Sequence, residues 1–205
     1  MRLLMIILLA AQTLLVGGCD KASAPKEQAQ ETAPPDAAVR EPSPKRGDIG
    51  LESLSGMTAN LTYANAGAAA PDVSFTGADG RDVHLSDFAG RPLLVNIWAT
   101  WCAPCKAEMP TLDKLSALEE GKISVIAVSQ DLEGRKVVQP YFAQNGFENL
   151  EPYTDTQNAL LVNIGNNVKL PTTILYDSQS REVWRVEGGV EWDDAEMAKL
   201  IAEAR

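Results

Sequence analysis

The sequence predicts an α/β fold, in which helices flank a central mixed β-sheet. Residues 92–98 and 123–128 are apolar runs of strand length, as expected for strands that are buried on both faces of a sheet. Residues 103–119 lie between these runs and place apolar side chains at helical spacing. Strand and helix patterns continue to alternate towards the C-terminus, which is typical of a sheet covered by helices. The 205 residues suffice for one such domain plus appendages.

The main expected elements follow the order β-β-β-α-β-α-β-β-α, and a short segment and a further helix are inserted after the second α. The first two strands, residues 71–75 and 82–85, alternate around a glycine-containing turn and should form a β-hairpin. Asn145-Gly146 should stop the second helix, and Asp193 or Asp194 is a suitable N-cap for the last one. The later elements are expected at residues 135–144 (helix), 151–154 (a short segment), 157–163 (helix), 172–177 and 182–186 (a hairpin) and 193–204 (helix).

The most informative stretch is Cys102-Ala103-Pro104-Cys105, which holds two of the three cysteines at a predicted strand-to-helix junction. Unpaired N–H groups and the positive end of the helix dipole favour a thiolate at Cys102. Cys105 lies one turn further along, close enough to form a disulfide with Cys102 or to resolve a mixed disulfide. Pro104 suits the first turn, where its missing N–H costs no hydrogen bond. The spacing therefore predicts a redox-active dithiol.

Other interpretations of the cysteine pair are weaker. A structural zinc site needs four ligands, and the rest of the chain offers only Cys19 and His84. An inert disulfide that closes so small a loop would stabilise little. We therefore expect no metal and no cofactor, and we interpret His84 as a structural or surface residue. The net charge of −10, without a cluster of Lys or Arg, argues against a nucleic-acid partner.

The N-terminus has the features of an export signal. Residues 1–18 begin with Met-Arg, continue with an apolar run too short to span a bilayer comfortably, and end in Gly17-Gly18 before Cys19. Small residues before a cysteine resemble the lipobox of bacterial lipoproteins, which implies a lipid anchor on Cys19. An ordinary cleaved signal and a retained membrane helix are the alternatives. Asp20 follows the cysteine, a residue that is associated with inner-membrane retention in enteric bacteria.

Composition divides the remainder of the chain. Residues 19–48 are rich in Ala, Pro, Glu, Gln and Lys and nearly lack large apolar side chains, so we expect a disordered tether. Residues 49–69 form an N-terminal extension, which we expect to pack on the domain as a short helix or an extended strand. Residues 70–205 form the folded domain.

Four motifs within this domain are specific when taken together: Ala70-Pro71-Asp72-Val73-Ser74-Phe75, Leu85-Ser86-Asp87-Phe88-Ala89-Gly90, the stretch from Asn96 to Pro110 around the cysteines, and Leu170-Pro171-Thr172-Thr173. They resemble the thioredoxin superfamily and, more narrowly, the membrane-tethered TlpA/ResA-like thiol-disulfide oxidoreductases. The resemblance implies a thioredoxin-like fold with an extra N-terminal β-hairpin and a central insert.

The resemblance also assigns roles to individual residues. Pro171 matches the cis-proline that faces the cysteine pair, which places Leu170 in contact with substrate, and Glu108 matches an active-site glutamate. We expect Glu108 to be the proton acceptor or tuning charge of the dithiol, and a solvated surface carboxylate is the alternative. Asn96 stands where cytosolic thioredoxin has an aspartate that helps to deprotonate the inner cysteine, and an amide cannot accept that proton. Further contacts with the substrate are expected from Trp101, Ala103 and Pro104, and Trp98 is expected to wall the site.

The function implied by the resemblance is that of a membrane-tethered periplasmic reductant of client disulfides. Its clients would be the haem-binding cysteines of apocytochrome c or the copper-site cysteines of cytochrome oxidase, among exported proteins. A membrane electron donor of the DsbD/CcdA kind would reduce it again. We expect a monomer at the periplasmic face of the bacterial inner membrane, anchored by lipid, with a soluble periplasmic protein as the alternative.

Three other functions are weighed against this one. A DsbA-like oxidase would carry a histidine between its cysteines, whereas this chain has Ala103-Pro104, and residues 128–170 are short for the helical insert of such oxidases. A peroxiredoxin-like peroxidase needs a threonine where this chain has Ala99. A copper-delivery module, which is not an enzyme, would use a CxxxC spacing and a distant histidine.

Overall fold

A computed structural model describes residues 47–51, 59–165 and 168–204 of the chain. The predicted signal (1–18), the lipidation site Cys19 and most of the predicted tether (19–48) lie outside these residues. Within the described part, no helix combines the length and the apolar character that crossing a membrane requires.

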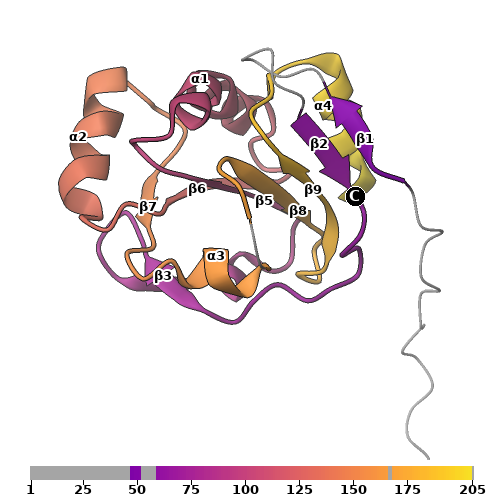
Figure 1. Cartoon of the computed structure of the whole chain (residues 1–205), viewed down its shortest axis with the longest axis horizontal. Helices are drawn as coiled ribbons and strands as arrows, with labels where there is room; N and C mark the ends of the chain where they lie inside the picture. Colours follow the sequence, from indigo (N-terminus) through magenta and orange to yellow (C-terminus); the bar gives the residue numbers. More distant parts are fainter. Residues whose placement is uncertain (1–46, 52–58, 166–167, 205) are drawn as a thin grey trace, which may run out of the picture. The chain divides into compact units, whose positions relative to one another are not determined.

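Nine strands form one sheet in the order β1-β2-β9-β8-β5-β6-β7-β3-β4 (Figure 1). The strands are β1 (Ile49–Leu51), β2 (Ala59–Thr62), β3 (Ser74–Thr76), β4 (Asp82–His84), β5 (Leu93–Trp98), β6 (Ser124–Ser129), β7 (Pro152–Thr154), β8 (Thr172–Tyr176) and β9 (Glu182–Glu187). The helices are α1 (Ala103–Leu118), α2 (Arg135–Asn145), α3 (Ala159–Asn163) and α4 (Ala195–Ile201), with short 3-10 turns at Leu85–Phe88 and Ala202–Ala204.

The central strand β5 is buried along its whole length because both of its faces are covered. It runs parallel to β6 and antiparallel to β8, which makes the sheet mixed. Alternation along β5 directs Leu94, Asn96 and Trp98 to one face and Leu93, Val95 and Ile97 to the other. The apolar members of these two sets belong to two separate hydrophobic clusters. Figure 1 shows α1 and α3 on opposite sides of these central strands.

Helix α1 covers the first of these faces with a continuous buried stripe. The buried residues are Cys105, Glu108, Met109, Leu112 and Leu115, which recur at helical spacing. Glu108 is the one charged residue in this stripe. The helical period that builds the core therefore also turns this carboxyl group towards the sheet.

The predicted fold class is confirmed. Residues 49–69 contain extended strands, one of the two expected forms. The bounds of several elements differ from the expectation: the first expected strand (71–75) is β3 at Ser74–Thr76, and the last expected helix (193–204) begins as α4 at Ala195. Residues 49–51 and 59–62 form antiparallel strands, and β2 extends the sheet by pairing with β9. Helix α3 begins at Ala159, two residues later than expected, because Asn158 takes a left-handed conformation (φ 53°). The Asp155 carboxylate accepts hydrogen bonds from the backbone N–H groups of Ala159 and Leu160, which fixes this start.

Candidate active site

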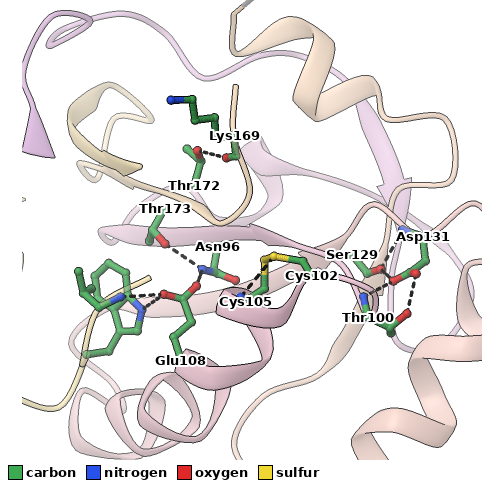
Figure 2. The surroundings of a disulfide bond; sticks show 12 residues. Asn96, Thr100, Cys102, Cys105, Glu108, Ser129, Asp131, Lys169, Thr172 and Thr173 are labelled. Atoms are coloured by element: carbon green, nitrogen blue, oxygen red, sulfur yellow. Dashed lines mark hydrogen bonds between the residues drawn. A yellow bond between two sulfur atoms is a disulfide. The ribbon is translucent and has the colours of Figure 1, made fainter. Parts of the chain in front are cut away.

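The two cysteines lie where the chain turns from β5 into α1. Cys102 is the N-cap of α1, and its Sγ accepts a hydrogen bond from the backbone N–H of Cys105 at 3.3 Å. A disulfide joins the two residues, whose Cα atoms are 5.3 Å apart (Figure 2). Cys105 is completely buried, whereas Cys102 retains 6% of its surface. The pair is therefore asymmetric, with Cys102 on the outer side.

A buried aspartate holds the turn that precedes Cys102. Asp131, just after β6, accepts hydrogen bonds from the backbone N–H of Thr100 (2.8 Å) and from its hydroxyl group (2.7 Å). The hydroxyl group of Ser129 donates to the same carboxylate at 2.6 Å. Because β5 and β6 are parallel, their C-terminal ends meet at one edge of the sheet, and this network joins the ends there (Figure 2).

A groove of about 640 Å³ opens beside Cys102, and Cys105 is not among its lining residues. Its walls are mainly apolar and include Trp101, Pro104, Leu132, Leu161 and Leu170. Trp101 and Leu132 are large apolar side chains with 69% and 73% of their surfaces exposed. An exposed apolar rim around a reactive sulfur suits contact with another polypeptide.

The Leu170–Pro171 peptide bond is cis, as the motif predicts. The carbonyl of Pro171 accepts a hydrogen bond from the backbone N–H of Gly188 (2.9 Å), which ties this turn to the end of β9. Leu170, Trp101 and Pro104 line the groove. Ala103 is exposed but does not line it.

Glu108 is completely buried, so it is not a solvated surface carboxylate. Its Oε1 accepts a hydrogen bond from Asn96 Nδ2 at 2.7 Å. Its Oε2 accepts from the indole Nε1 of Trp192 at 3.0 Å and from the backbone N–H of Val190 at 3.2 Å. Burial disfavours the charged form and raises the pKa of Glu108 to about 8, although these three hydrogen bonds act in the opposite direction.

Strand register explains why Asn96 reaches Glu108. Asn96 lies on the face of β5 that α1 covers, and it pairs directly with Thr173 of β8. Its Nδ2 donates to the hydroxyl oxygen of Thr173 at 2.8 Å as well as to Glu108. Figure 2 shows Asn96 between the Glu108 carboxyl group and the disulfide. Among the residues that the structure describes, no group donates a hydrogen bond to Asn96 Oδ1, which is buried.

Comparison with known proteins agrees with this geometry. The profile of the Redoxin family matches residues 65–201, which include the whole site. The chain belongs to the Redoxin family.

Curated relatives narrow the assignment within this family. The thiol-disulfide oxidoreductase ResA of Oceanobacillus iheyensis is 30% identical over 148 residues, which cover 70% of this chain and 76% of the relative. ResA of Geobacillus kaustophilus is 29% identical over 149 residues, which cover 72% and 84% of the two chains.

Solved structures show the same relation. A candidate thiol-disulfide oxidoreductase from Bacteroides vulgatus superposes with a TM-score of 0.59 at 28% identity, covering 68% of this chain and 96% of the other. A candidate thiol:disulfide interchange protein DsbE from Chlorobium tepidum gives a TM-score of 0.60 at 26% identity, with the same coverages. This Redoxin-family chain is a thiol-disulfide oxidoreductase of the ResA/DsbE type.

Sequence reasoning missed part of the site in this Redoxin-family chain. Trp192 and Val190 contact Glu108 from more than 80 residues away, and no local pattern indicates such a contact. Trp98 was expected to wall the site, but its ring packs against Tyr141 and Phe142 in the core, and it does not line the groove. Strand alternation could have indicated this, because Trp98 shares with Leu94 the face of β5 that packs into the core beneath α1.

Proposed function

We propose that this chain is an extracytoplasmic, membrane-tethered reductant of protein disulfides, with Cys102 as the attacking nucleophile. The observation that carries the proposal is the asymmetry of the cysteine pair. Cys102 lines the groove and sits at the start of α1, whereas Cys105 is completely buried. A client disulfide that enters the groove can therefore meet only Cys102, and the helix N-terminus favours its thiolate.

The reaction transfers two electrons from the dithiol to the client. The Cys102 thiolate attacks one sulfur of the client disulfide, the S–S bond breaks, and the second client sulfur leaves as a thiolate. Cys105 then loses its proton and attacks Cys102 Sγ in the mixed disulfide, which releases the first client sulfur. The client ends as a dithiol after taking up protons, and the chain ends with the Cys102–Cys105 disulfide that the structure contains.

Glu108 is the proposed acceptor of the Cys105 proton. Its carboxyl group is buried on the same face of α1, and a pKa of about 8 lets it bind and release a proton near neutral pH. Asn96 lies between the two groups and orients them without taking up the proton, because an amide is not a proton acceptor. Its Nδ2 donates to Glu108, and its Oδ1 has no donor among the described residues in the disulfide form. A disulfide has no S–H group, so a donor for Asn96 Oδ1 becomes available when Cys105 is reduced to the thiol.

The clients and partners are proposed from the groove, from the N-terminal sequence and from the resemblance to the TlpA/ResA-like proteins. An apolar groove with exposed Trp101 and Leu132 favours extended polypeptide segments around cysteine pairs. The export signal and Cys19 support a lipid anchor. The resemblance to the TlpA/ResA-like proteins supports apocytochrome c or the copper-site cysteines of cytochrome oxidase as clients. A membrane donor of the DsbD/CcdA kind would return the electrons.

The direction of electron flow is tested by the reduction potential of the Cys102–Cys105 pair, measured on the full chain in dithiothreitol and glutathione redox buffers. We expect a value near that of thioredoxin, about −270 mV. A value near that of DsbA, about −120 mV, would show that the chain is an oxidant.

The roles of the two cysteines are tested by trapping. We expect Cys105→Ser to accumulate a mixed disulfide with a disulfide-bonded client peptide, because the resolving thiol is absent. Cys102→Ser, the matched control, should trap none, because Cys105 is buried. Both variants also carry Cys19→Ser, so that no third thiol can form a mixed disulfide. The reverse pattern would contradict the assignment.

A further inference from the structure

The segment that follows β9, residues 188–193, is tied to α1 at the carboxyl group of Glu108. Gly189 brings this segment close to the helix, because a Cβ atom there would lie 3.3 Å from the Pro104 carbonyl oxygen. The next residues supply two donors to one oxygen, Glu108 Oε2: the backbone N–H of Val190 and the indole N–H of Trp192. Trp192 is completely buried, so water does not compete for this contact.

Two further contacts join this segment to α1. They are made by Thr111 and Lys114, which follow Glu108 on the helix at intervals of three residues. The backbone N–H of Trp192 donates to Thr111 Oγ1 at 3.2 Å, and the Thr111 hydroxyl group donates to the Glu108 carbonyl oxygen at 2.9 Å. Lys114 forms an ion pair with Asp193 at 2.6 Å. Trp192 is therefore held at two points, its backbone and its indole, and its indole N–H has a defined direction towards Glu108.

The two oxygens of Glu108 consequently have different surroundings. Oε2 already accepts two N–H donors, so a proton that binds there would displace one of them. Among the described residues, Asn96 Nδ2 is the one donor to Oε1, so a lone pair of Oε1 remains for a proton. The other N–H of Asn96 Nδ2 donates to the hydroxyl oxygen of Thr173. Proton uptake is therefore easier at Oε1, the oxygen on the side of Asn96, and Asn96 lies towards the disulfide (Figure 2).

We propose that Trp192 is a positioning residue for the thiol exchange: its indole N–H, together with the Val190 N–H, holds Glu108 Oε2 and leaves Oε1 to exchange the proton of Cys105. This inference rests on the proposed role of Glu108 as the proton acceptor. The hydrogen bond from Trp192 favours the charged carboxylate and lowers the pKa of Glu108. Removing it should therefore raise that pKa.

The hydrogen bonds that the structure records at the Glu108 carboxylate all come from neutral groups, the Asn96 amide of β5 and the two N–H groups of residues 188–193. The charged side chains on the adjoining elements are directed elsewhere. Lys106 of α1 and Glu191 are exposed, and Lys114 and Asp193 pair with each other. The other titratable group on this face of α1 is Cys105, once it is reduced. Trp192 therefore acts on Glu108 without competition from a paired cation.

The experiment uses Trp192→Phe, which keeps an aromatic ring but removes the N–H. Trp184→Phe is the matched control, because Trp184 is equally buried and its indole donates to the Leu200 carbonyl oxygen instead, at 3.0 Å. The reduced full chain, with Cys19→Ser so that Cys102 and Cys105 carry its two thiols, is mixed with the aromatic disulfide DTNB in a stopped-flow instrument between pH 5 and 9. The second equivalent of released aromatic thiolate reports the attack of Cys105 on Cys102.

In the wild-type chain, the rate of this second release should rise with pH through the pKa of Glu108, about 8. Trp192→Phe should move this rise to higher pH by about one unit, which lowers the rate at pH 7 about tenfold. Trp184→Phe should leave the pH profile unchanged. In a chain that already carries Glu108→Gln, adding Trp192→Phe should not change the pH profile further. Equal profiles for the two tryptophan variants would overturn the inference.

A measurement on the wild-type chain covers the case in which Trp192→Phe does not fold. The indole N–H resonance of Trp192 should titrate with Glu108 in an NMR pH series, and that of Trp184 should not. An unchanged Trp192 resonance would overturn the inference. If Glu108→Gln itself leaves the rise of the second release unchanged, the proton acceptor has been wrongly assigned, and the proposed function fails at that step instead.

Discussion

Two glutamates are buried in the described part of the chain, and the structure compensates their burial in different ways. Glu182 at the start of β9 is 4% exposed and forms a bidentate pair with Arg185, with both N···O distances at 2.7 Å. Glu108 is completely buried and accepts hydrogen bonds from neutral donors only. A buried carboxylate with a cation stays charged, whereas one without a cation is driven towards its protonated form.

The pairing of Glu182 with Arg185 depends on an irregularity in the sheet. Residues three apart in a strand normally point to opposite faces. Between β8 and β9 the register shifts, so that Leu175 pairs with Trp184 and Tyr176 with Glu182. The extra residue, Val183, returns Glu182 to the face of Arg185. Arg185 also donates to the Ile164 carbonyl oxygen at 2.9 Å, so this pair fixes the chain after α3.

The comparison indicates that charge compensation separates a structural carboxyl group from a reactive one. The pair of Glu182 and Arg185 fixes β9 against the chain after α3. Removing either partner leaves the other as an unpaired buried charge. In the proposed function, Glu108 exchanges a proton because its surroundings stabilise both forms to a similar degree near neutral pH. The predictions below test this difference, from the largest expected effect to the smallest.

The largest expected effect is a pH dependence of stability that belongs to Glu108. Its pKa is about 8 in the folded chain and 4.5 in the reference state, so the folded chain binds more protons between these values. Stability is therefore full below pH 4.5 and falls as the pH rises through 8, by on the order of 5 kcal/mol. The measurement is urea unfolding of the wild-type chain and Glu108→Gln at each pH.

Glu108→Gln should remove most of this slope, because the glutamine side chain does not titrate. The difference in unfolding free energy between the two chains isolates the contribution of Glu108 from that of other groups. A wild-type chain that becomes more stable from pH 5 to pH 8 relative to Glu108→Gln would show that Glu108 is stabilised as a carboxylate.

The second effect is expected at the other glutamate. Arg185→Leu should destabilise the domain by roughly 3 to 4 kcal/mol, because it leaves Glu182 buried without a cation. The double variant with Glu182→Leu should recover much of this loss, since replacing both partners by apolar groups removes the uncompensated charge. Urea unfolding checks both variants. An Arg185→Leu loss below about 1 kcal/mol would contradict the structural role of the pair.

The sequence predicts the parts of this comparison that have a local pattern. Strand length, apolar runs and helical spacing identify β5, β6 and α1, and the same spacing places Glu108 on the face of Cys105. Contacts that join distant segments leave no such pattern. The register shift that pairs Glu182 with Arg185, and the approach of Trp192 to Glu108, depend on how the sheet and the last loop pack.

The groove illustrates the same limit. Its lining comes from the start of α1, the loop after β6, α3 and the residues before β8. Trp101, Pro104 and Leu170 lie beside recognisable motifs and could be predicted from them. Leu132 and Leu161 could not be predicted as groove residues, because an isolated leucine in a loop or a short helix is equally typical of the core.

A third, smaller effect is expected where Asn96 is held. Thr173→Val removes the second acceptor of Asn96 Nδ2 and should cost about 1 kcal/mol in unfolding free energy. It should also shift the pH profile of Cys105 attack, because Asn96 then has no acceptor except Glu108. Thr172→Val is the matched control, since that hydroxyl group donates to the Lys169 carbonyl oxygen. Equal pH profiles for the two variants would show that Thr173 does not act on Glu108.

The smallest effect is expected at the exposed end of residues 188–193. The ion pair between Lys114 and Asp193 lowers the pKa of Asp193, but the Lys114 side chain is 64% exposed and competes with water. Lys114→Met should therefore cost less than about 0.5 kcal/mol, and added salt should reduce the difference from the wild type. The pH profile of Cys105 attack should not change.

This last result would separate the two kinds of contact that hold the segment. If the buried hydrogen bonds of Trp192 determine its position, loss of an exposed ion pair about two and a half helical turns from Cys105 leaves the indole N–H on Glu108. If Lys114→Met instead shifts the profile as far as Trp192→Phe does, the segment is held from its exposed end. The pKa of Glu108 would then depend on a surface charge. Both buried glutamates would be influenced by a cation, directly in Glu182 and at a distance in Glu108.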